Sequence, residues 1–209
     1  MADMAQIARA VEGGRRKVVD QLVREALAEG VKAETILNEG MVVGMTNLGE
    51  QFKNGEVYVP EVLVAARAMK TGTEILKPLL VAENVQSLGT VAIGTVEGDL
   101  HDIGKNLVGM MLEGSGFTVM DLGVDVKPEM FIDAVRGGAK IIGMSALLTT
   151  TMPMMAKVIE RLKDEGLRDQ VKVMIGGAPI TQEYADEIGA DGYSTDAASA
   201  AELAKRLIA

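Results

Sequence analysis

Hydrophobic positions in the first 80 or so residues recur at the three- and four-residue spacing of helices. The stretch Arg15–Glu29 repeats apolar pairs at this spacing, and Gly30 follows it where a helix would end. A further apolar stripe runs along Ala33–Lys53, and Pro60 suits the first turn of another helix. With a short helix at Met4–Glu12, the pattern predicts an N-terminal four-helix bundle joined by short loops.

The pattern changes after the bundle. Pro78 is expected to end or kink the last helix, and the polar segment 81–89 has the composition of a linker. From Thr90 onward, short apolar runs alternate with helical periods. Strands are predicted at 90–95, 118–122, 141–145, 171–175 and 191–194, and helices at 102–114, 128–137, 151–165, 181–188 and 197–208. The expected fold is a helical domain over 1–85 and an α/β domain over 89–209, a doubly wound five-stranded parallel sheet of Rossmann-like or flavodoxin-like order.

Composition narrows the classes of function. Of 209 residues, 48% are hydrophobic, which is enough for packed cores. The formal net charge of −9 disfavours contact with a phosphate backbone, so we expect no nucleic-acid partner. Without cysteine the chain has no disulfides, thiolate ligands or thiol nucleophiles. The N-terminus does not read as a signal peptide and no apolar run is long enough to span a bilayer, so a cytoplasmic location is expected.

The single histidine, His101, follows the first predicted strand, at the sheet edge where α/β proteins bind ligands. Asp99 could hold one ring nitrogen and leave the other free for a metal. Gly98 and Gly104 flank the pair and would allow a large ligand to approach. The alternatives are a helix start capped by Asp99 or Asp102, with an incidental histidine, or a small-ion site made of Asp99, His101 and Asp102.

Two other predicted strands end in unusual residues. Ser145 to Thr151 holds four hydroxyl side chains, although helix capping would need only one of them. Gly176 and Gly177 leave room at the next strand end, although such a pair can simply form a tight turn. No phosphate-binding glycine motif follows the first strand.

Together, the three strand ends resemble the signature of cobalamin-binding domains in corrinoid proteins and methionine synthase. That signature is Asp-x-His-x-x-Gly, Ser-x-Leu and Gly-Gly, and here it is carried in order by Asp99/His101/Gly104, Ser145/Leu147 and Gly176/Gly177. The segment 58–62 is similar to the start of the helix that lies over the corrin in that family. The resemblance covers nearly the whole chain.

The resemblance implies cobalamin, in its methylated or reduced form, or a related corrinoid, bound base-off with His101 as the lower cobalt ligand. Asp99 and a hydroxyl would extend this ligand into a hydrogen-bonded relay. The family spacing points to Thr151, with Thr149 and Thr150 as alternatives. The expected cofactor contacts are Gly98, Asp99, His101, Asp102, Ile103, Gly104, Ser145, Leu147, Thr149, Gly176, Gly177, Ala178 and Tyr58.

The expected function is that of a non-enzymatic, methyl-carrying corrinoid subunit of an anaerobic methyltransferase system. Implied partners are a substrate-specific methyltransferase, a second methyltransferase acting on a thiol or tetrahydrofolate, and a reductive activase. Radical mutases and complete methionine synthases need further domains for which this chain has no room. The alternative is a B12-dependent sensor or regulator, which also pairs a helical bundle with such a domain.

Overall fold

The computed structural model describes residues 2–83, 85 and 87–209. The chain divides into two compact units: a helical unit of Met1–Ser87 with Gly114–Gly116, and an α/β unit of Leu88–Glu113 with Phe117–Ala209. Positions 84 and 86 of the predicted linker lie outside the described residues. Each unit is described by itself.

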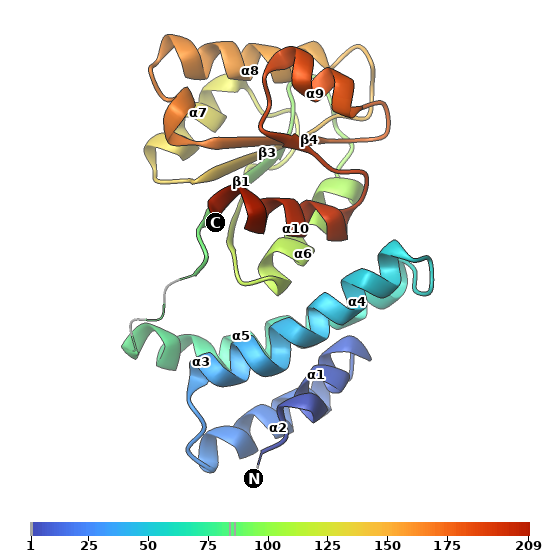
Figure 1. The fold of residues 1–209 in the computed structure, drawn as a ribbon, viewed down its shortest axis with the longest axis vertical. Coiled ribbons are helices and arrows are strands. Elements are labelled where there is room, and N and C mark those ends of the chain that lie inside the picture. Colours follow the sequence, from blue (N-terminus) through green and yellow to red (C-terminus); the bar gives the residue numbers. More distant parts are fainter. Residues whose placement is uncertain (1, 84, 86) are drawn as a thin grey trace. The chain divides into compact units, whose positions relative to one another are not determined.

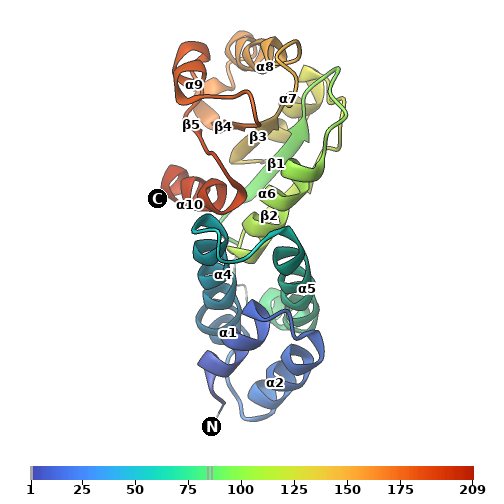
Figure 2. The same cartoon turned by 90° about the vertical axis from the view of Figure 1, so that its right-hand side faces the viewer.

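The helical unit packs its helices around an apolar interior. Its elements are α1 (Met4–Glu12), α2 (Arg16–Ala28), α3 (Ala33–Thr35), η1 (Ile36–Val42), α4 (Val43–Lys53) and α5 (Val59–Ala82). Helix α1 packs against η1 and α4, and α2 packs against α5 (Figure 2). Buried Ile7, Val19, Met41 and Leu76 form part of this interior. The helices expected from the apolar spacing are therefore present.

The predicted single helix over 33–53 is wrong in one respect. Its middle, η1, is π-helical, so the segment consists of three successive helical pieces. Glycines mark the place where this segment crosses α1. A Cβ at Gly40 would lie 3.0 Å from the Ile7 side chain, and one at Gly44 would overlap the Ala8 carbonyl oxygen. Close packing at residues of low helix propensity accounts for the altered winding.

Pro78 does not end its helix. Helix α5 continues through it to Ala82, a full turn beyond the proline. At the other end, the Tyr58 backbone N–H donates to the Glu61 carboxylate at 3.0 Å, which gives this helix an acidic first turn. Within the described residues, no helix combines the length and apolar character needed to cross a bilayer.

The α/β unit alternates strands and helices. Its elements are β1 (Thr90–Thr95), α6 (Ile103–Gly114), β2 (Thr118–Asp121), α7 (Pro128–Arg136), β3 (Ile141–Ser145), α8 (Pro153–Asp164), η2 (Arg168–Gln170), β4 (Lys172–Gly176), α9 (Gln182–Ile188), β5 (Gly192–Tyr193) and α10 (Ala197–Ile208). The described residues form one parallel sheet in the order β2-β1-β3-β4-β5. This is the flavodoxin-like order. The last strand is only two residues long, shorter than predicted.

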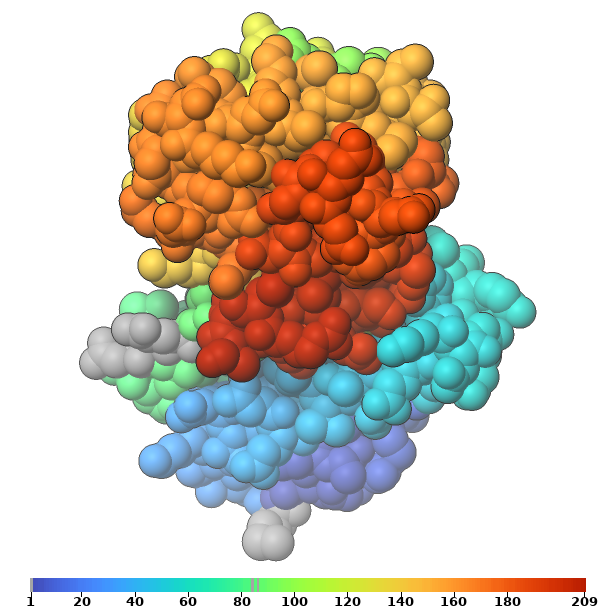
Figure 3. Space-filling view, turned by 45° about the horizontal axis from the view of Figure 1, so that its top comes forward, coloured from blue at the N-terminus to red at the C-terminus, as the bar shows by residue number. Residues whose placement is uncertain are grey.

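Helices cover both faces of the sheet. Figure 1 shows α7, α8 and α9 on one side and α6 and α10 on the other. The first side buries an apolar core that includes Val96, Phe131 and Ile159. On the other side, a Cβ at Gly109 would approach Ile93 to 2.9 Å, so α6 lies close against β1. In Figure 3 the side chains of α8, α9 and α10 form much of the α/β surface facing the viewer.

The carboxyl ends of β1, β3 and β4 lie in one row. Thr95 pairs in register with Ser145, and Ser145 pairs with Gly176. The chain leaves β1 toward β2 on one side, whereas β3 lies on the other, so β1 and β3 flank the point where the strand order reverses. Ligands of open α/β sheets bind at such a point. The three sequence motifs therefore meet at the expected edge.

Candidate functional site

The site centres on a hydrogen bond between a buried carboxylate and a half-exposed imidazole. Nδ1 of His101 lies 2.7 Å from Oδ1 of Asp99. The Asp99 side chain is fully buried, whereas the His101 side chain is 52% exposed. Because an ionised carboxylate only accepts hydrogen bonds, Nδ1 carries the proton and Nε2 keeps its lone pair. None of the described residues forms a hydrogen bond with Nε2.

Asp99 is bound on every side by donors. Its Oδ1 also accepts the His101 backbone N–H at 3.1 Å. Its Oδ2 accepts the backbone N–H groups of Leu147 and Leu148, at 2.8 and 3.2 Å, and the hydroxyl of buried Thr151 at 2.9 Å. The loop after β1 is thus joined to the loop after β3 through one carboxylate.

These bonds fix the charge of Asp99. Burial raises the pKa of this carboxyl, but the hydrogen bonds from His101, Leu147 and Thr151 outweigh burial and hold the pKa well below its ordinary value. Asp99 is therefore a carboxylate at neutral pH, and it keeps the His101 ring in one tautomer.

The structure distinguishes the three candidate threonines. Thr151 reaches Asp99, whereas Thr149 and Thr150 are exposed on the preceding turn. Thr151 Oγ1 also lies 2.9 Å from the Leu148 carbonyl oxygen. A hydroxyl has one hydrogen to donate, and the charged acceptor gives the stronger bond.

A small-ion site made of Asp99, His101 and Asp102 does not match the geometry, whereas Asp102 directly precedes α6, as a helix-capping residue would. Asp99 has both oxygens committed to the bonds above, and the Asp102 carboxylate accepts from the side chain of Asn106 at 3.1 Å. These carboxylates and His101 therefore do not converge on a common point. No group of three or more potential ligands that could hold a metal ion occurs among the described residues.

The two loops that Asp99 joins both expose apolar side chains. Leu100 and Ile103, on the β1 side, are 71% and 73% exposed. Leu147 and Leu148, in the loop after β3, are also exposed. Gly104, in the first turn of α6, has no heavy atom within 4 Å of where a Cβ would lie. The fold does not require glycine there, and exposed leucine and isoleucine of this kind mark a ligand or partner surface.

The glycine pair after β4 serves two purposes. Gly177 has φ +136°, and a Cβ on it would overlap the Ala146 carbonyl oxygen, so the fold itself requires this glycine. At Gly176 a Cβ would meet only the Ser194 carbonyl oxygen, at 3.5 Å. Exposed Ala178 follows, and half-buried Ser145 is the ladder partner of Gly176. Small residues therefore line this part of the edge.

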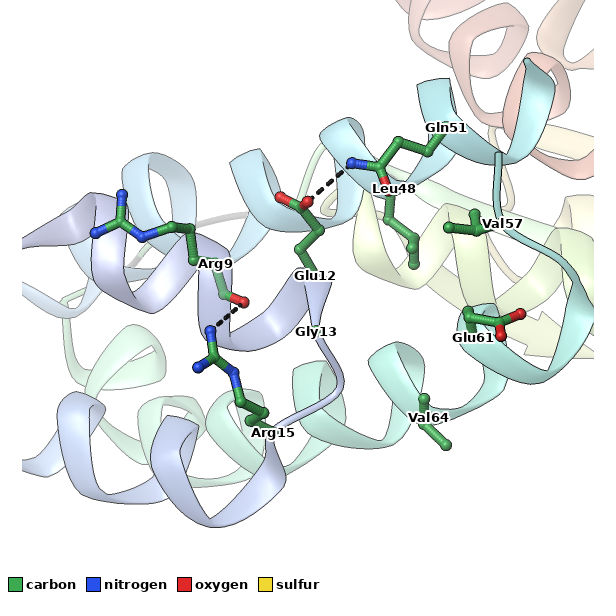
Figure 4. A pocket seen from close by; sticks show the side chains of 9 residues that line it. All are labelled: Arg9, Glu12, Gly13, Arg15, Leu48, Gln51, Val57, Glu61 and Val64. Carbon is green, nitrogen blue, oxygen red and sulfur yellow. Dashed lines mark hydrogen bonds between the residues drawn. The ribbon is translucent and has the colours of Figure 1, made fainter. Parts of the chain in front are cut away.

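Tyr58 belongs to the helical unit, where it is exposed at the start of α5. Its contact with the cofactor stays a prediction. A 410 Å³ pocket lies in the same unit between α1, α4 and α5 (Figure 4). Its polar groups are largely paired with each other: Gln51 donates to Glu12 at 2.8 Å, and Arg15 donates to the Arg9 carbonyl at 3.0 Å.

Some residues of the site lack any motif in the sequence. The Thr95 hydroxyl donates to the His101 carbonyl at 2.8 Å, and the Asp125 carboxylate accepts the Gly98 N–H at 2.7 Å. Lys105 is buried in α6 and places its ammonium 2.6 Å from both carboxylate oxygens of Asp121 at the end of β2. In the sequence, Lys105 could be noticed only as a charged residue in a mostly apolar helix, and this pattern does not indicate Asp121 as its partner.

Comparison with known proteins finds matches to both units of the chain. Residues 89–202 match a B12 binding domain family, and residues 4–77 match a second family of the same description. The chain is 42% identical over 212 residues to a corrinoid protein of Desulfitobacterium hafniense strain Y51, covering 100% of this chain and 98% of the relative. It is 47% identical over 180 residues to trimethylamine corrinoid protein 1 of Methanosarcina acetivorans, covering 85% and 83% of the two chains.

A solved structure resembles both units at once. It is the methanol:cobalamin methyltransferase complex MtaBC of Methanosarcina barkeri, one chain of which matches with a TM-score of 0.85 and 30% identity. The match covers 98% of this chain and 79% of that one. The fold, including the helical segment before the sheet, is that of cobalamin-binding proteins.

Proposed function

The chain belongs to the family of B12-binding corrinoid proteins, and from that premise we propose that it carries a methyl group from a substrate-specific methyltransferase to a second methyltransferase. When bound, the corrinoid supplies the cobalt centre that accepts and releases the methyl group. The chain itself binds and tunes this cofactor, so it acts as a carrier subunit rather than as an enzyme.

The observation that carries the proposal is the Asp99–His101 pair with its free Nε2. An imidazole whose Nδ1–H is bonded to a carboxylate has a more basic Nε2 and a fixed ring orientation, as metal-ligating histidines do. We assign His101 as the lower ligand in base-off binding. The open space at Gly104 and the exposed Leu100 and Ile103 fit a large, mostly apolar ring beside it.

The small residues at the ends of β3 and β4 are assigned to the nucleotide tail. They combine hydroxyl groups, which can donate to a phosphate or ribose, with glycines that leave the sheet edge uncovered. The residues proposed to line this slot are Ser145, Leu147, Thr149, Gly176, Gly177 and Ala178. Gly98, Asp102 and Ile103 complete the contacts on the β1 side.

Asp99 and Thr151 fix the position of the proton on the His101 ring. The carboxylate keeps the Nδ1–H of His101 in place, and Thr151 and two backbone N–H groups keep the carboxylate charged. An imidazole that did not ligate cobalt would have its Nε2 lone pair free to accept a proton. The relay therefore couples ligation by His101 to proton uptake.

The partners follow from the family. One relative is named for trimethylamine, and another with the same fold is part of a methanol methyltransferase complex. We propose a substrate methyltransferase, with an amine as the first donor to test, a second methyltransferase that delivers to a thiol or tetrahydrofolate, and a reductive activase. Domain limits of 1–85 and 89–209 accord with the two separate family matches.

The test is a reconstituted transfer. The protein is loaded with hydroxocobalamin, reduced, and mixed with candidate methyltransferases and trimethylamine, dimethylamine or methanol, while the visible spectrum reports the methylated cofactor. We expect methylation with one donor and its partner, and discharge on adding a second methyltransferase with its thiol or folate. A loaded protein that no partner methylates, but whose adenosylcobalamin form bleaches in light and changes DNA affinity, would establish a sensor instead.

A further inference from the structure

Asp125, in the turn between β2 and α7, has an unusual backbone. Its φ of 53° lies in the left-handed region, and no other non-glycine residue among those described has a positive φ. Aspartate and asparagine tolerate this conformation better than other side chains. Such conformations persist where the surrounding structure fixes them, and they concentrate at functional sites.

The residue bonds to the His101 loop twice. Its Oδ1 accepts the backbone N–H of Gly98 at 2.7 Å, and its own N–H donates to the carbonyl of Asp99 at 3.0 Å. The two partners lie three and two residues before the histidine, and Gly98 is itself in the left-handed region, with φ +84°. Asp125 therefore grips the backbone on either side of the peptide that joins Gly98 to Asp99.

The turn that carries Asp125 is anchored in the sheet. The Val126 N–H donates to the Thr95 carbonyl at 2.9 Å, and the Thr95 N–H donates to the Gly123 carbonyl at 3.0 Å. The hydroxyl of this same Thr95 donates to the His101 carbonyl. Hydrogen bonds to the buried strand β1 therefore hold the turn that carries Asp125 in place.

We propose that Asp125 is a positioning residue, which sets the backbone of Gly98 and Asp99 so that the Asp99 carboxylate meets Nδ1 of His101. Asp99 can bond the ring and the β3 loop together only if its Cα is held at the right height above the sheet edge. The left-handed turn directs both the carboxylate and the N–H of Asp125 at that backbone. The purpose of this geometry rests on the function proposed above, but the geometry itself exists in the cofactor-free protein.

Two substitutions separate the side-chain bond from the backbone conformation and from the charge. Asp125→Asn removes the charge but keeps a carbonyl acceptor and the tolerance for positive φ. Asp125→Gly removes the same charge and tolerates the backbone at least as well, but has no acceptor for the Gly98 N–H. The asparagine variant is therefore the matched control for the glycine variant.

The experiment is ¹⁵N NMR of the cofactor-free protein at pH 8, where its single histidine gives one pair of ring signals. In the wild type and in Asp125→Asn we expect the Nδ1–H tautomer, with slow exchange of the Gly98 amide. In Asp125→Gly we expect a mixture of tautomers and Gly98 exchange about tenfold faster, the effect of losing one charge-assisted hydrogen bond. Urea unfolding should give the glycine variant a midpoint only slightly below that of the asparagine variant, because the bond that is lost is exposed to solvent.

Two results would overturn the proposal. If Asp125→Gly kept the wild-type histidine signals, the residue would be an ordinary turn residue. If its urea midpoint fell well below that of Asp125→Asn, the residue would act on the stability of the whole unit rather than on the loop. Neither result bears on cobalt ligation, because no cofactor is present. Failure of the carrier function is detected separately, by the spectra of the loaded wild type.

Discussion

Nδ1 of His101 lies 2.7 Å from a carboxylate oxygen of Asp99, and the Asp99 side chain is fully buried whereas that of His101 is 52% exposed. The carboxylate is inside the sheet edge and the imidazole is largely outside it. A residue in the first position is held by the fold, whereas a residue in the second is available to a ligand. Substitution of Asp99 should therefore change mainly the stability of the protein, and substitution of His101 mainly the spectrum of the bound cofactor.

Asp99→Asn should destabilise the cofactor-free protein by about 1–3 kcal/mol. Both Asp99 oxygens accept hydrogen bonds, and in the variant an NH₂ group would replace one of them and face the same donors. Urea unfolding followed by circular dichroism measures this. The control is Asp102→Asn, whose carboxylate bonds only one side-chain amide; its effect should stay within about 0.5 kcal/mol. Equal stability of the two variants would contradict the buried acceptor role of Asp99.

Thr151→Val replaces a buried hydroxyl with a methyl group of nearly the same size. We expect a loss of about 1–2 kcal/mol in unfolding free energy, because Asp99 loses a donor it cannot replace with water. Thr150→Val is the comparison, since Thr150 is exposed in the same turn. The choice of Thr151 would be refuted by a Thr150→Val variant that lost as much stability as Thr151→Val.

Two glycines test the difference between a glycine required by the fold and one left open for a ligand. Gly177→Ala should lower stability by at least about 2 kcal/mol, because its Cβ meets the Ala146 carbonyl. Gly104→Ala should leave the cofactor-free protein as stable or up to about 1 kcal/mol more stable. Its affinity for hydroxocobalamin should nevertheless fall about tenfold, as expected if one methyl group obstructs the ring. Unchanged affinity would remove Gly104 from the contact surface.

The pKa of Asp196, the N-cap residue of α10, predicts a pH dependence of stability. Burial raises its pKa, but bonds from the backbone N–H and hydroxyl of Ser199 outweigh this and lower the pKa below its ordinary value. A lowered folded-state pKa contributes stability that is complete above the unfolded value of about 3.9 and is lost as the pH falls through the folded value. Asp196→Ala should therefore cost about 1 kcal/mol at pH 7, through loss of the α10 N-cap, and less at pH 3. A deficit that grew on acidification would contradict this sign.

Local patterns predicted most of the fold and the centre of the site. The alternation of apolar strands and helices places Asp99, Ser145 and Gly176 at one sheet edge, because the carboxyl ends of parallel strands share an edge. The patterns did not predict the π-helical segment, and of the two outcomes expected at Pro78, the end of the helix is wrong. The π-helical segment lies where Gly40 and Gly44 approach α1, a contact between helices that local propensity does not contain.

The remainder of the site depends on contacts between loops. Three consecutive threonines have the same chemistry, and only the path of the turn after β3 selects Thr151. Asp125, after β2, bonds Gly98, and Lys105 bonds Asp121 at the end of β2. The members of these pairs are 27 and 16 residues apart in the chain. Spacing in the sequence carries no information about such pairs.

The most direct test of the account is electron paramagnetic resonance of the cobalt(II) form in wild type and in His101→Ala, both reconstituted with hydroxocobalamin and reduced. His101 is exposed, so the variant should fold and keep part of its cofactor affinity through the nucleotide tail. We predict nitrogen superhyperfine splitting from one axial imidazole in the wild type and its disappearance in His101→Ala. Identical signals from the two proteins would show that His101 is not the cobalt ligand.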